Sequence, residues 1–122
     1  MLNKLIICEG PTDLEFLASS LELLKYERMS EFDKGKFKEV ELKKRKKTIK
    51  VVSVDGISNI LSYISVVTQD LLRQQKISKK DVIVVVDDLD FRKEKDRFQN
   101  FPFRIVNYHR SMTDGFHAHR HG

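Results

Sequence analysis

The sequence predicts an α/β fold with a central, mainly parallel four-stranded sheet and helices on both faces. The first indication is the run Val82–Val86, in which five consecutive residues are β-branched. A short, continuous apolar run is typical of a strand buried on both faces, as in parallel sheets. The second is the alternation of strand-like and helix-like segments, which predicts right-handed β-α-β crossovers and a three-layer, Rossmann-like arrangement.

The first half of the chain contains a predicted strand and a predicted helix. The apolar run Leu5–Cys8 is the first strand, and it stops at Glu9-Gly10-Pro11. Thr12 and Glu15 have the spacing of a capping box, and leucines follow them at helical intervals. We therefore expect Glu9 at the tip of a strand and a helix directly after it.

The second half continues the alternation. A second strand, Thr48–Val54, is stopped by Asp55-Gly56, and Ser58 is the predicted cap of a second helix. The third strand is the Val82 run itself. Residues 91–99 are a short, charged helix candidate, and 104–108 make a fourth strand.

These elements predict one domain over residues 1–110 and a flexible tail over 111–122. Residues 28–48 are expected to form a basic insertion or loop, although the apolar residues from 37 to 42 leave room for a short strand or hairpin. The tail carries alternating histidines, His117, His119 and His121. In an extended chain they can chelate a transition metal, and the alternative is a mobile terminus without a native metal role.

Composition predicts a soluble, cytoplasmic protein with no membrane association. Charged residues make up 34% of the 122 residues, and no apolar run approaches the roughly 18 residues that a membrane span needs. The N-terminus lacks the layout of a signal peptide. The single cysteine, Cys8, has no internal disulfide partner, and we expect it to be buried and reduced.

Positive charge is concentrated in one segment. The net charge is +5, and residues 34–50 hold nine Lys or Arg against two Glu, so the remaining residues sum to about −2. One basic segment on a mildly acidic body predicts contact with nucleic acid, DNA or RNA, although a solvated loop is the alternative. The predicted contacts are Lys43, Lys44, Arg45, Lys46, Lys47, Arg92 and Lys93.

Three carboxylates follow the third strand. If the chain stays extended, Asp88 and Asp90 point to the same side, where each raises the pKa of the other unless a cation neutralises them. Oxygen ligands of this kind suit Mg²⁺ or Mn²⁺. The alternative is that these residues, with Asp87, cap the following helix. Because the carboxyl ends of parallel strands share one edge, Glu9 is expected to join the same site.

In order and placement, these motifs resemble the Toprim domain. Glu9-Gly10-Pro11-Thr12-Asp13 resembles its first motif, and Asp88-Leu89-Asp90 resembles the later Asp-x-Asp. Residues 55–59 resemble the Gly-containing loop of its nuclease branch, the overcoming-lysogenization-defect proteins. The resemblance covers residues 2–108.

The resemblance implies a Mg²⁺- or Mn²⁺-dependent domain that acts on nucleic-acid phosphodiesters, with a nuclease ranked above a topoisomerase or primase. It implies that Glu9 acts as general acid, general base or metal participant and that Asp88 and Asp90 bind the metal. Asp87 is an alternative ligand in a shifted register. Gly10, Asp13 and Gly56 are expected to support the site.

The chain departs from the topoisomerase and primase pattern because Phe91-Arg92-Lys93 follows Asp-x-Asp where those enzymes have a Gly or another acid. Its tyrosines are expected to be core or surface residues. Two other functions remain open: a non-catalytic Toprim-like module that binds nucleic acid or protein, and a receiver-type phospho-acceptor domain. The protein is expected either to stand alone or to form the catalytic part of a larger assembly.

Overall fold

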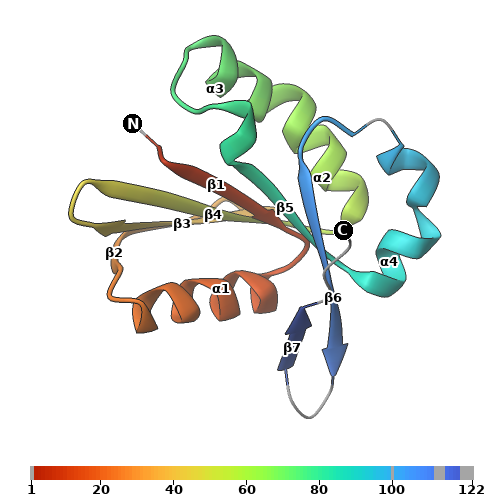
Figure 1. Cartoon of the computed structure of the whole chain (residues 1–122), viewed down its shortest axis with the longest axis horizontal. Helices are drawn as coiled ribbons and strands as arrows, with labels where there is room; N and C mark the ends of the chain where they lie inside the picture. The colour runs from red at the N-terminus through yellow and green to blue at the C-terminus, as the bar shows by residue number, and fades with distance from the viewer. Residues whose placement is uncertain (1, 100, 112–114, 119–122) are drawn as a thin grey trace.

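The computed structural model describes residues 2–99, 101–111 and 115–118. In these residues a seven-stranded mixed sheet has the order β2-β3-β4-β1-β5-β6-β7 (Figure 1). In chain order the elements are β1 (Lys4–Cys8), α1 (Pro11–Leu23), β2 (Glu27–Asp33), β3 (Phe37–Lys44), β4 (Lys47–Val54), α2 (Ile57–Tyr63), the π-helical η1 (Ile64–Thr68), α3 (Gln69–Arg73), the 3₁₀ turn η2 (Lys79–Asp81), β5 (Val82–Asp87), α4 (Asp88–Lys93), the 3₁₀ turn η3 (Lys95–Phe98), β6 (Arg104–Ser111) and β7 (Gly115–Ala118).

The α/β class is confirmed, and the four predicted strands form the parallel centre of the sheet. Strand β1 pairs in parallel with β4 on one side and β5 on the other, and β5 pairs in parallel with β6. The predicted number of strands is wrong, because β2 and β3 extend the sheet beyond β4 and β7 extends it beyond β6, all by antiparallel pairing.

Helices cover both faces of this sheet, as predicted (Figure 1). On one face Leu14 and Ala18 of α1 pack with Cys8 and Val51. On the other face α2 and η1, which run on into α3, bury their apolar side chains against the opposite side of the same strands. Because successive side chains of a strand point to opposite faces, the apolar residues of β1, β4 and β5 contribute to both cores.

Residues 28–48 are more regular than the sequence predicts. They form most of β2, all of β3 and a two-residue turn into β4. Val40 and Leu42 are buried against α1. Their charged neighbours Glu39 and Glu41 point to the other face of the strand, the alternation expected where a strand is packed on one side. The high charge of this segment reflects one solvated strand face and not an irregular loop.

Both predicted helix caps are wrong by two positions. Gly10 is the N-cap of α1, so Thr12 lies within the first turn, and Gly56 is the N-cap of α2, so Ser58 also lies within its helix. The helix predicted over 91–99 begins three residues earlier, at Asp88, and ends in η3.

The predicted flexible tail is wrong for residues 115–118, which form β7 against β6. Residue His117 belongs to this strand, whereas His119 and His121 lie outside the described residues, so the proposed histidine chelate is not tested. Within the described part of the chain, no helix is both long enough and apolar enough to cross a membrane.

Candidate active site

The site forms where the carboxyl ends of β1 and β5 lie side by side. Glu9 directly follows β1, and its Oε1 accepts a hydrogen bond from the backbone N–H of Asp87 at 2.8 Å, although 78 residues separate them. The sheet register makes this contact possible, because Cys8 is level with Val85 on the neighbouring strand. The expectation that the fold brings Glu9 to the end of β5 is confirmed.

Glu9 has an unusual protonation equilibrium. Burial raises the pKa of its carboxyl to about 7, and a hydrogen bond with the Asp90 side chain and the negative charges of Asp90 and Asp87 act in the same direction. The hydrogen bond from the Asp87 backbone opposes the shift. These causes favour the protonated form of the Glu9 carboxyl, so Glu9 can hold or release a proton near neutral pH beside Asp87 and Asp90.

Asp87 and Asp90, not Asp88 and Asp90, are the aspartates beside Glu9. The strand ends at Asp87, whose side chain caps α4 by accepting the backbone N–H of Leu89 at 2.8 Å. The prediction that Asp88 and Asp90 converge in an extended chain is therefore wrong. In a helix, residues two apart do not share a face.

Asp88 points toward β6. It is buried, its Oδ1 accepts Asn107 Nδ2 at 2.8 Å, and its Oδ2 lies 3.0 Å from Arg92 Nη2. These contacts join the first turn of α4 to β6. Arg92, predicted to contact nucleic acid, is 72% exposed and extends from this ion pair to the surface.

Of the three residues expected to support the site, Gly56 and Gly10 adjoin Glu9. The backbone N–H of Gly56 donates to the carbonyl of Glu9 at 3.1 Å, and its φ of 98° strongly favours glycine. Gly10 has an extended φ of −148°, which any residue adopts. Asp13 is buried in the first turn of α1, where the helix dipole favours a negative charge.

Two residues near the site, Asn107 and Tyr108, were not predicted from the sequence to belong to it. Tyr108 lies level with Asp87 on β6, and burial together with the charges of Glu9 and Asp87 raises its pKa. Tyr108 is buried, as expected, but it lies beside the acidic cluster. The available signal was an amide and a phenol side by side in the strand that follows the acidic motif.

The donor chemistry of Glu9 and Asp90 fits Mg²⁺ or Mn²⁺. Among the described residues no set of three or more His, Cys, Asp or Glu side chains is arranged to hold a metal ion. Mg²⁺ is commonly held by one or two carboxylates, with waters and substrate phosphates as the other ligands. Burial is the main cause of the raised pKa of Glu9, and the negative charges of Asp90 and Asp87, which a bound cation would offset, add to it.

The basic run is not beside the carboxylates. Residues 43–47 lie at the amino ends of the parallel strands, because β4 starts at Lys47 and its carboxyl end, Val54, is level with Phe37. Seven residue steps along β4 correspond to about 23 Å. The cations on the same edge as Glu9 include Lys34 and Lys36 of the β2–β3 turn and Arg92 and Lys93 of α4.

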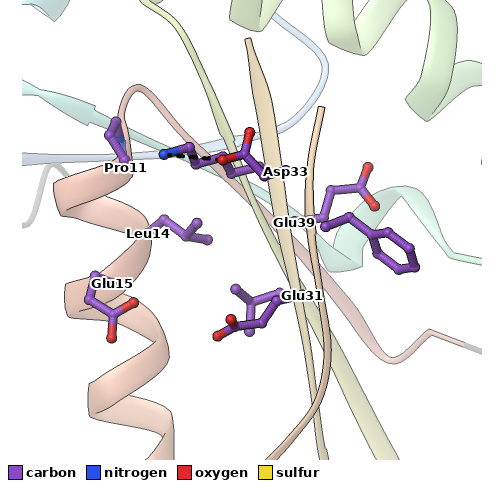
Figure 2. Close-up of a pocket in the computed structure, with 9 residues that line it drawn as sticks. Pro11, Leu14, Glu15, Glu31, Asp33 and Glu39 are labelled. Atoms are coloured by element: carbon purple, nitrogen blue, oxygen red, sulfur yellow. Dashed lines mark ion pairs between the residues drawn. The ribbon is translucent and has the colours of Figure 1, made fainter. Parts of the chain in front are cut away.

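A groove of about 390 Å³ between α1 and the β2–β3 hairpin runs past Pro11 (Figure 2). Figure 2 shows Glu15 on α1 and Glu31 on β2 on opposite sides of it. Arg28 forms ion pairs with both, at 2.6 and 2.7 Å. Through Arg28, these carboxylates hold α1 against the hairpin, so they have a structural role. The candidate active site is therefore the edge of the sheet at Glu9, not this groove.

The fold and the site define an α/β protein with an acidic cluster at the carboxyl edge of its parallel strands. No protein-family model matches the sequence, and no curated protein sequence matches it significantly.

Proposed function

We propose that the protein is a Toprim-type nuclease that cleaves nucleic-acid phosphodiesters with Mg²⁺ or Mn²⁺. The observation that carries the proposal is the Glu9 carboxyl held at the end of β5 by the Asp87 backbone N–H, 2.8 Å away. Its pKa of about 7 lies at the pH where a general acid or base is most effective. The resemblance to the Toprim motifs is supported by the adjacency of β1 and β5, because each motif follows one of these two parallel strands.

The residues have separate roles in this proposal. Glu9 and Asp90 would hold the cation, which stabilises negative charge on the phosphate oxygens when bound. Glu9 also exchanges a proton with the reacting groups. Asp87 fixes the start of α4 through its cap, and its backbone N–H orients the Glu9 carboxyl. Asp88 acts as a positioning residue, through Asn107 and Arg92.

The test is cleavage of plasmid DNA, single-stranded DNA and RNA with Mg²⁺ or Mn²⁺. We expect Glu9→Gln and Asp90→Asn each to lower the cleavage rate by at least about 100-fold, the usual contribution of general acid–base catalysis. Asp96→Asn makes the same change at an exposed acid on η3 and serves as the control. Equal rates for Glu9→Gln and the control would refute the proposal.

A second function, a non-catalytic module that binds nucleic acid, is favoured by one observation. Asp88, the first acid of the Asp-x-Asp motif, is already engaged by Asn107 and Arg92. In that case the wild type and Glu9→Gln would be equally inert while both retard nucleic acid on a gel.

A further inference from the structure

The amino-end edge of the sheet contains a basic groove of about 470 Å³. It is lined by Tyr26, Lys44, Arg45, Lys46 and Lys47. Lys43, by contrast, points to the other face of β3, where Glu41 lies beside it. Four of the five lining side chains are cations and none is an acid, so the groove concentrates positive charge that an anion would neutralise.

The wall of the groove is ordered by direct contacts. Lys44 Nζ donates to the carbonyl of Leu24 at 2.9 Å and lies 5.7 Å from the centre of the Tyr26 ring. Tyr26 in turn follows the end of α1, where its backbone N–H donates to the carbonyl of Leu21. The end of α1 and the β3–β4 turn therefore form one surface.

Two backbone positions at this surface hold cations where a glycine fits better. Arg45 has φ 55° in the two-residue turn between the paired residues Lys44 and Lys47. Lys25 has φ 75° just after the last turn of α1, in a Schellman motif that usually places glycine there. A side chain disfavours both conformations. Local rules are often broken at functional sites, and both of these positions carry a cation beside the groove.

We propose that this groove binds the phosphate backbone of a nucleic-acid strand, at a site separate from the carboxylate edge. Four adjacent cations match a polymer with regularly repeated phosphates, which displaces one condensed counterion per contact. The site lies about 23 Å from the end of β4 that adjoins Glu9, the length of the strand. It needs no metal and no cleavage, so it stands or falls independently of the nuclease.

The test is binding of a fluorescent 15-nucleotide oligothymidylate to the full chain in EDTA, measured by anisotropy at several salt concentrations. The variant Arg45→Gly/Lys46→Ser removes two cations and gives the turn a residue suited to φ 55°. We expect about tenfold weaker binding and a salt slope smaller by about 1.4, from two contacts at about 0.7 each. Its melting temperature, expected to be no lower than that of the wild type, excludes unfolding as the cause.

The matched control is Lys34→Gln/Lys36→Gln, which removes two exposed cations from the β2–β3 turn at the opposite edge. Without a divalent cation this edge carries the acidic cluster, so we expect less than a twofold effect. Lys47→Gln, which leaves the turn residues in place, should weaken binding by severalfold.

Three outcomes would overturn the proposal. Equal losses in the groove variant and the control would show that binding follows net charge alone. No binding by the wild type would show that the groove does not hold nucleic acid. Binding to vesicles that contain phosphatidylserine, but not to the oligonucleotide, would identify a membrane surface as the occupant.

Discussion

The Glu9 carboxyl links the chemistry of the site to the stability of the fold. Its pKa is about 7 in the folded protein and 4.5 when unperturbed. The folded state therefore binds more protons than the unfolded state between these values, and the free energy of unfolding must fall as the pH rises through this window. Above pH 7 the protein holds a partly desolvated negative charge beside two aspartates.

We predict that the wild type loses about 2 kcal/mol of stability between pH 4.5 and pH 7.5 through this group. A shift of this size corresponds to about 3 kcal/mol, discounted for solvent screening. In Glu9→Gln the loss should be absent, because glutamine accepts the Asp87 N–H and donates to Asp90 without titrating. Urea denaturation of both proteins across this pH range measures the difference. Parallel curves would show that Glu9 titrates normally.

Two glycines beside the site make a matched pair for a second prediction. Gly56→Ala forces a side chain into φ 98° and should cost about 1–3 kcal/mol of stability. Gly10→Ala has an ordinary φ, and nothing lies within 4 Å of the added carbon, so it should cost well under 1 kcal/mol. Thermal unfolding of the two variants checks the order. Loss of cleavage in a stable Gly10→Ala protein would indicate that a ligand approaches this backbone closely.

At the scale of elements, α4 is held by its first turn. Asp88 receives the Asn107 amide and pairs with Arg92, and so connects α4 to β6. The directions of the Asp87 and Asp90 side chains depend on where this helix begins. The orientation of the acidic motif is thus fixed by two residues outside it, Asn107 and Arg92.

We predict that Asp88→Ala destabilises the protein by about 2–3 kcal/mol, because it removes a buried carboxylate that accepts a hydrogen bond from the Asn107 amide. Arg92→Ala removes only the exposed ion pair with Asp88 and should lower the stability by less than about 1 kcal/mol. Chemical denaturation distinguishes them. Equal, small effects would mean that the Asn107 contact contributes little to holding α4.

The β3–β4 turn gives the opposite kind of prediction. Arg45→Gly/Lys46→Ser relieves the φ 55° strain at Arg45 and separates adjacent cations, so stability should rise by up to about 1 kcal/mol. The melting temperature at low salt measures the gain. A lower melting temperature would show that Arg45 makes contacts that offset its strain.

Sequence patterns predicted the centre of the fold better than its edges. Strands β1 and β5 contain continuous apolar runs, and β4 places apolar residues on both of its faces, which is a strong strand signal. Strands β2 and β3 contain many charged residues between their apolar ones. Their high charge therefore led to the prediction of a loop where the structure has a regular hairpin. The parallel topology was enough to predict that Glu9 lies at the end of β5. It was not enough to predict which of the three aspartates lie beside Glu9. After Asp87 the chain turns into a helix because the Asp87 side chain caps it. The spacing of apolar residues in the sequence does not reveal such a cap.

At the scale of the whole molecule, a bound cation should counteract the pH effect. If Mg²⁺ or Mn²⁺ binds at Glu9 and Asp90, a concentration 100 times its dissociation constant stabilises the folded state by about 2.7 kcal/mol. We expect the gain at pH 8 to exceed that at pH 5, where protons compete for Glu9. Thermal unfolding with and without the metal checks this, with Glu9→Gln as the control. An equal gain in that variant would locate the cation elsewhere.

The single cysteine, Cys8, can report how often the centre of the sheet opens. Cys8 is fully buried on the middle strand of the sheet, and its thiol donates to the carbonyl of Val52 at 3.4 Å. A thiol reagent can reach it only when β1 separates from a neighbouring strand or α1 lifts away. Its rate of labelling therefore measures how often the centre of the sheet opens, one residue away from Glu9.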